Sequence, residues 1–105
     1  MTNIPKKAES AFVKENIDAL LEFLKASEGD VRITPAHISL FVALWRRKQL
    51  NQEERIHFFR YELSEMCKIS SPTTFFNNLR DLHTFGYLKY TPSHNSFLGS
   101  LVEFT

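Results

Sequence analysis

The stretch ELSEMCKISSPTTFFNNLRDLHTFGYLKY, residues 62–90, decides the fold of this chain. It opens with Leu63, Met66 and Cys67, which place apolar side chains on one face of a short helix. The apolar periodicity then stops at a Ser-Pro pair, residues 71–72. This pair predicts the start of a second helix, because a serine hydroxyl caps free N–H groups and proline suits the first helical position.

The second helix of this stretch, residues 72–85, has one buried side and a defined end. Phe75, Leu79 and Leu82 recur at spacings of four and three, so one side of the helix must be buried. Gly86 supplies the left-handed position that commonly ends a helix. Two helices joined by a three- or four-residue turn form a helix-turn-helix unit.

Strand patterns precede and follow that unit. Residues 87–91 and 100–104 alternate as half-buried strands do, and a loop rich in Pro, Ser and Asn joins them. Residues 55–59 alternate enough to form a short strand that pairs with these two. We therefore expect an α+β, mostly α fold: a winged helix-turn-helix with a small antiparallel wing sheet.

Two more helices come before the short strand. Residues 5–27 are amphipathic, and a Thr-Pro cap begins a helix over residues 35–48 that is apolar around much of its circumference and therefore central. The apolar stripe of the first helix consists of Val13, Ile17, Leu20, Leu21 and Leu24, widened by Phe12 and Phe23. This helix packs on the core, or part of its wide face forms a homodimer interface. We divide the chain into an N-terminal amphipathic helix, residues 1–30, and a winged helix-turn-helix domain, residues 31–105.

Composition indicates one folded domain without a strong electrostatic field. The chain has 105 residues, 43% of them hydrophobic and 10 of them Phe, which supports a core and argues against disorder. Residues 1–30 carry four Lys and six acidic side chains (−2), and residues 31–105 carry nine basic and six acidic ones (+3). The helix-turn-helix part is therefore mildly basic, far short of a strongly basic nucleic-acid protein.

Cysteine usage and hydropathy indicate the compartment. Cys67 is the only cysteine, so an intrachain disulfide is excluded, as is typical of a reducing cytoplasm. The start MTNIPKKAES has no apolar signal core, and no apolar run reaches membrane-spanning length. We expect a cytoplasmic protein without membrane association.

Polar and cationic side chains gather on the outer face and at the start of the second helix of the quoted stretch. Asn77 can pair with an adenine edge, Arg80 with guanine or a phosphate, and Phe76 can contact a thymine methyl. Hydroxyls and free N–H groups at a helix N-terminus suit phosphate oxygens. The candidate DNA-binding residues, including those of the wing, are Ser70, Ser71, Thr73, Thr74, Phe76, Asn77, Arg80, Lys89, His94 and Asn95.

No pattern indicates catalysis, a cofactor or a metal site. The four histidines show no metal-ligand spacing with Cys67 or with one another. Asp81 and His83 are not a catalytic pair, because residues two apart on a helix do not face each other. We expect His83 to be a partly buried packing residue, and we expect the protein to be neither an enzyme nor a cofactor carrier.

Two motifs carry a family resemblance. They are RITPAHISL at residues 32–40 and GYLKY at residues 86–90, the second followed by Pro92, Ser93, Asn95, Phe97, Gly99 and Ser100. Together with their spacing, they resemble the small winged-helix regulators of Bacteroidetes conjugative and mobilizable transposons, which include excision accessory proteins and transcriptional regulators. The resemblance covers about residues 18–104. It implies DNA binding in excision or transcription, with an integrase or another recombination protein as a partner.

We therefore expect sequence-specific binding of double-stranded DNA by a transcriptional regulator or excision accessory factor of a mobile element. The alternative is a winged-helix protein–protein interaction module that uses Phe76 and the wing leucines as an apolar patch. A basic stripe along the long helix and wing favours DNA, and a contiguous apolar patch there favours a protein partner.

Overall fold

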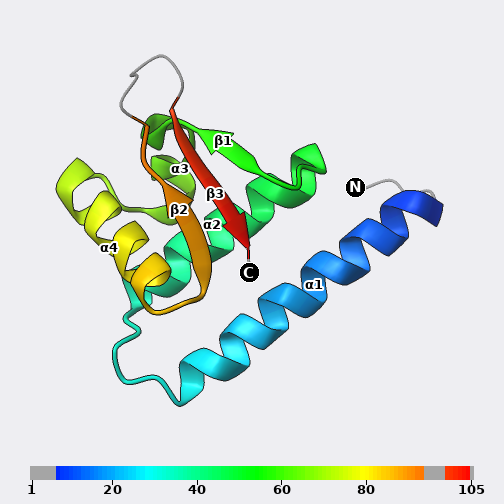
Figure 1. The fold of residues 1–105 in the computed structure, drawn as a ribbon, viewed down its shortest axis with the longest axis horizontal. Coiled ribbons are helices and arrows are strands. Elements are labelled where there is room, and N and C mark those ends of the chain that lie inside the picture. The colour runs from blue at the N-terminus through cyan, green and yellow to red at the C-terminus, as the bar shows by residue number, and fades with distance from the viewer. Residues whose placement is uncertain (1–6, 94–98, 105) are drawn as a thin grey trace.

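The computed structural model describes the backbone of residues 7–93 and 99–104, and the side chains of residues 17–93 and 99–104. It is a small, mostly helical α+β fold with four helices and a three-stranded antiparallel sheet (Figure 1). The predicted DNA contacts His94 and Asn95 lie outside the described residues. The elements are α1 (Lys7–Glu28), α2 (Pro35–Asn51), β1 (Ile56–Phe58), α3 (Arg60–Cys67), α4 (Pro72–Thr84), β2 (Leu88–Thr91) and β3 (Ser100–Phe104).

Both predicted Ser/Thr-Pro helix starts are confirmed. At the start of α2, the Thr34 hydroxyl accepts the His37 N–H, and the His37 ring Nδ1 accepts the Thr34 N–H at 2.9 Å. At the start of α4, the Ser71 hydroxyl accepts the Thr74 N–H at 3.3 Å. Each cap satisfies a backbone donor that the helix itself leaves unpaired, and this is why both helices begin where the sequence indicates.

Helix α3 begins without a capping side chain. Its N-cap residue is Phe59, whose ring has no acceptor, and the Glu62 carboxylate instead accepts the Phe59 N–H at 2.7 Å. Lys68 ends the helix in the left-handed conformation, at φ +60°. The turn between α3 and α4 therefore consists of residues 68–71, and it carries an exposed lysine.

The sheet has the strand order β1-β3-β2, and both pairings are antiparallel. Val102 is the partner of Ile56 on one side and of Tyr90 on the other. Gly99 leads into β3 at φ +69°, and a Cβ at this position would lie 2.6 Å from the Phe58 carbonyl oxygen. The entry to β3 therefore requires glycine for both its backbone conformation and its space.

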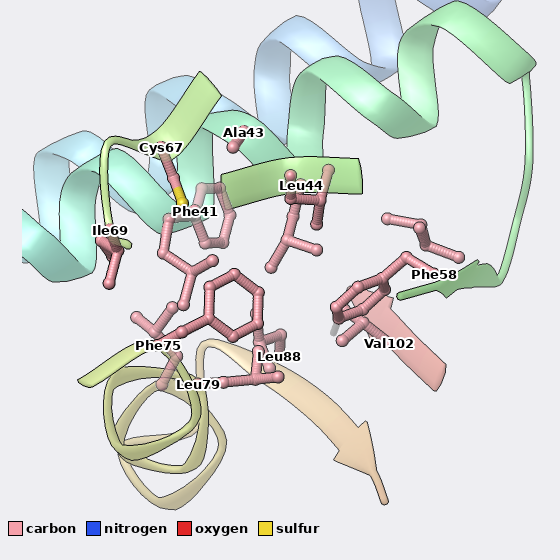
Figure 2. Close-up of a cluster of buried hydrophobic side chains, with 14 of the residues drawn as sticks. Phe41, Ala43, Leu44, Phe58, Cys67, Ile69, Phe75, Leu79, Leu88 and Val102 are labelled. Carbon is pink, nitrogen blue, oxygen red and sulfur yellow. The ribbon is translucent and has the colours of Figure 1, made fainter. Parts of the chain in front are cut away.

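The core lies between the sheet and α2, α3 and α4 (Figure 2). Helix α2 contacts α1, α3, α4 and β1, which confirms its predicted central place. Phe58 meets Phe75 ring edge to ring face at a centroid distance of 6.2 Å. The predicted buried side of α4 is confirmed, because its three apolar residues are fully buried: Phe75, Leu79 and Leu82.

Two predicted packing residues are exposed instead. Met66 was expected on the apolar face of α3, yet it is 45% exposed, while Leu63 and Cys67 are buried. His83 is exposed, and its ring Nδ1 accepts the Tyr90 N–H at 3.0 Å, where β2 turns back from α4. Met66 lies at the border of the buried face of α3, and the His83 ring bonds to the backbone of β2 instead of packing in the core.

Helix α1 joins the fold through its C-terminal half. Phe23 is 4% exposed and stacks on Phe41 of α2, with ring centroids 3.8 Å apart and an interplanar angle of 5°. It also meets Tyr87 edge-on at 5.2 Å. Ile17 and Leu21 of the same predicted stripe are 39% and 56% exposed. None of the helices in the described part of the chain is long and apolar enough to cross a membrane.

Candidate nucleic-acid interface

The outer face of α4 is polar and exposed. Thr73, Asn77 and Arg80 are all exposed, on the side of the helix opposite its buried face. An Arg80 Nη1–H donates to the Asn77 side-chain oxygen at 3.1 Å, which holds the two predicted base-reading groups together. The structure thus brings these three predicted residues onto one surface.

The prediction that the Phe76 side chain is exposed is wrong in part. It is only half-buried, packs against the core cluster, and meets Phe75 edge-on at a centroid distance of 5.1 Å. Its position beside the buried face of α4, rather than opposite it, explains this packing. The part of its ring that remains accessible offers a smaller apolar contact than the sequence suggested.

The N-terminus of α4 carries the three predicted hydroxyl residues Ser70, Ser71 and Thr74, all exposed. With Lys68 they line a shallow, open hollow of about 300 Å³ beside the start of α2. The Ser70 carbonyl accepts a hydrogen bond from Arg60 Nη1 at 3.1 Å, which ties the turn to the start of α3. The positive end of the helix dipole, the hydroxyls and one ammonium together favour an anion at this end of the helix.

Lys68 is a candidate contact that sequence reasoning missed. In the sequence, Lys68 stands only where the apolar periodicity of the first helix stops after Cys67. The structure shows that its left-handed backbone turns the chain toward α4 and leaves the side chain exposed beside Ser70 and Ser71. The position of Lys68 in the four-residue turn before α4 could have indicated that it lies beside the start of that helix.

The predicted wing contact Lys89 lies on β2, the strand that follows α4. It is exposed on β2, and its cross-strand partner is Glu103 of β3, which also pairs with Arg55 at 3.5 Å. Within residues 17–93 and 99–104, no hydrogen bond or ion pair joins Lys89 to the outer face of α4. Lys89 therefore belongs to a separate, wing-side part of the candidate interface.

A polar link between the buried His37 and the half-exposed Asp81 joins α4 to α2. The His37 side chain, 5% exposed, contacts Asp81 of α4 through Nε2, 2.8 Å from the carboxylate oxygen. Because Nδ1 of the same ring accepts the Thr34 N–H, the ring proton lies on Nε2 and is donated to Asp81. Asp81 directly follows Arg80, so this link fixes the part of α4 that presents the arginine.

A second polar cluster secures the C-terminal end of α4. Arg32 donates to both carboxylate oxygens of Asp30 at 2.8 Å each, and the Tyr87 hydroxyl donates to Asp30 at 2.7 Å. The Arg32 guanidinium lies 4.0 Å from the centroid of the Phe85 ring. The hydrogen bonds from Arg32, and then that from Tyr87, hold the pKa of Asp30 well below its ordinary value. Burial, followed by the bond to Asp30, raises the pKa of Tyr87.

Two observations concern groups that could hold a metal ion or act as a thiol. Among the residues that the structure describes, no three His, Cys, Asp or Glu side chains gather to hold a metal ion. Cys67 is buried, and burial raises the pKa of its thiol. Comparison with known proteins matches no protein-family model, no curated protein and no solved structure.

Proposed function

We propose that this chain is a winged helix-turn-helix protein that binds double-stranded DNA in a sequence-specific manner. Helices α3 and α4 form the helix-turn-helix unit, and strands β2 and β3 with their connecting loop form the wing. The element order α2-β1-α3-α4-β2-β3 and the strand order β1-β3-β2 support this assignment. In such a unit the second helix enters the major groove.

The character of the α4 surface carries the proposal. Its exposed side chains are hydroxyls, an amide and a guanidinium, with a lysine beside its N-terminus. A protein-binding module would instead need an apolar patch on α4 and the wing. The exposed large hydrophobic side chains among the described residues are Ile17, Leu21, Val31, Val42, Leu50, Tyr61 and Met66. None of these lies on α4, β2 or β3.

Each exposed group has a role in this proposal. Arg80 and Asn77 read base edges in the major groove, the arginine at guanine and the amide at adenine. Ser71, Thr74 and Lys68 hold a phosphate at the start of α4, which sets the register of the helix on the duplex. The half-buried contact between Asp81 and His37 of α2 keeps α4 at a fixed tilt.

The biological role is the part of the proposal that rests on the family resemblance. We place the protein as a transcriptional regulator or excision accessory factor of a mobile element, with an integrase or another recombination protein as partner. No cofactor and no catalytic step enters this role, because binding and bending or occluding DNA suffice for it.

The test is duplex DNA binding by wild type and by Arg80→Ala, after selection of a preferred site. Loss of a base-reading arginine should weaken binding by roughly 1–3 kcal/mol, or about 5- to 150-fold, and relax the preference at one base pair. The melting temperature should stay nearly unchanged, because Arg80 is exposed and its one side-chain hydrogen bond among the described residues goes to Asn77.

Arg46→Ala is the matched control. Arg46 is also an exposed arginine, and it lies on α2 rather than on α4 or the sheet. Its loss should leave DNA affinity within about twofold. Equal affinity for wild type and Arg80→Ala would reject the α4 face as the DNA surface.

A further inference from the structure

Helix α1 has an apolar face wider than the body of the protein covers. Leu20, Phe23 and Leu24 pack against the core cluster, whereas Ile17 and Leu21 are 39% and 56% exposed. Residues four apart lie one above the other on a helix, so these two form a continuous exposed strip. Among the described exposed hydrophobic side chains, they are the one pair at this spacing.

Helix α1 also reaches beyond the body. It has 22 residues and is therefore about 33 Å long. Figure 1 shows its first turns extending past the end of α2, away from the sheet. A helical segment without tertiary packing is marginal in water, because most helical stability in proteins comes from burying an apolar face. Ile17 and Leu21, at the border of the projecting half, leave an apolar strip exposed that a helical partner would cover.

We propose that the partner is the α1 helix of a second copy of this chain, packed antiparallel about a two-fold axis at Ile17. Ile17 stands at the midpoint of α1, between Lys7 and Glu28. A two-fold axis at this point places Ile17 against its own counterpart. It places Leu21 opposite helix position 13, which is also an apolar residue, Val13, in the sequence. The strip is thus self-complementary, as a symmetric dimer interface must be.

The charge distribution along α1 favours the antiparallel orientation. Residues 7–16 of α1 carry two Lys and two Glu (net 0), whereas residues 17–28 carry one Lys, two Glu and one Asp (−2). Antiparallel packing places the acidic half of each helix beside the neutral half of its partner. Parallel packing would place the two acidic halves together, and like charges across a helix pair repel. The exposed Lys25 then lies opposite position 9, a glutamate.

The area that a stable dimer needs requires contact along most of the 22 residues of α1. Specific interfaces bury roughly 1,200 Å² or more in total, which Ile17 and Leu21 alone do not provide. An antiparallel pair in contact along most of α1 adds the flanking turns on both sides of the axis. If the protein also binds DNA as proposed above, the two-fold axis would present two α4 helices to a palindromic site.

The oligomeric state tests the proposal independently of DNA. Sedimentation equilibrium of the full chain at tens of micromolar should give a dimer. Leu21→Asp should give a monomer with unchanged helical content by circular dichroism. Leu50→Asp is the matched control, because Leu50 is 58% exposed against 56% for Leu21 but lies at the end of α2. This control should remain a dimer.

Three outcomes overturn the proposed surface. They are a wild-type monomer, a Leu21→Asp variant that stays dimeric, and dissociation of the Leu50→Asp control to the same degree as Leu21→Asp. Each is read from the same sedimentation data, and none depends on whether the protein binds DNA.

Cysteine cross-linking tests the orientation. Ile17→Cys lies at the axis and should form an intermolecular disulfide readily with a mild oxidant. In an antiparallel pair, residue 21 and its own counterpart are offset by eight residues, or about 12 Å, beyond the roughly 7 Å that a disulfide spans between Cα atoms. Leu21→Cys should therefore cross-link poorly, and equal cross-linking of both variants would overturn the antiparallel arrangement. The native Cys67 is 1% exposed and does not compete.

Discussion

The contact between His37 and Asp81 predicts a stability loss that can be worked from its geometry. The His37 side chain is 5% exposed and donates through Nε2 to an Asp81 oxygen 2.8 Å away, whereas the Asp81 side chain is 48% exposed. In Asp81→Ala, removal of the carboxylate recovers little desolvation free energy, because this side chain is already about half exposed to water. The main cost falls on the imidazole, which keeps a buried N–H without an acceptor.

The expected magnitude is about 1–2 kcal/mol. A buried donor without a partner costs roughly 1–3 kcal/mol, and the lower part of that range applies because water can enter from the exposed Asp81 side. For a domain of this size, a loss of 1 kcal/mol lowers the melting temperature by roughly 4–8 °C. Asp81→Asn should lose less than half as much, since its amide oxygen can still accept the Nε2–H.

Urea unfolding followed by circular dichroism measures these changes. The matched control is Glu65→Ala on α3, which removes an exposed carboxylate and should stay within about 0.5 kcal/mol of wild type. A double-mutant cycle with His37→Ala should give a coupling energy of at least about 0.5 kcal/mol. Strictly additive losses, or an Asp81→Ala variant as stable as the Glu65→Ala control, would refute the reasoning.

Two further predictions concern the loops that secure the fold. The pKa of Asp30 is lowered in the folded protein, chiefly by hydrogen bonds from Arg32. Its charged form therefore stabilises the fold above pH 4, and this stability is lost as the pH falls below the ordinary value of 3.8. In acid-unfolding measurements, Asp30→Asn should lack this loss of stability with falling pH, whereas Asp18→Asn should keep it. Gly99→Ala should lower the unfolding free energy by more than about 2 kcal/mol, since a Cβ meets the Phe58 carbonyl oxygen at 2.6 Å and the backbone is left-handed. Gly29→Ala, where a Cβ meets nothing within 4 Å, should change the melting temperature little, and a Gly99→Ala variant as stable as this control would contradict the close approach.

The sequence predicts those parts of the fold that local chemistry determines. Thr34 and Ser71 each begin a helix because their hydroxyls cap backbone groups only three residues away. The strands before α3 and after α4 follow from alternation, and β3 has the predicted bounds Ser100–Phe104. The first helix of the quoted stretch begins at Arg60, because Glu62 supplies the cap that Phe59 lacks.

The remaining features depend on neighbours that are distant in sequence. His37 and Asp81 are 44 positions apart, so no local pattern joins them. Met66 and Phe76 sit at the borders of their apolar faces, and the width of the contacting neighbour decides which of them is covered. Lys68 lies beside α4 because its own backbone is left-handed, and side-chain periodicity does not reveal that conformation.

The central claim is that the α4 face and the wing bind duplex DNA, and one titration tests it most directly. Fluorescence anisotropy of a labelled duplex should be measured against protein concentration across a salt series. If at least three cations, such as Lys68, Arg80 and Lys89, displace counterions, the plot of log affinity against log salt should have a slope of roughly −3 or steeper. Absence of binding even at low salt, or an affinity that does not change with salt, would contradict the proposed function.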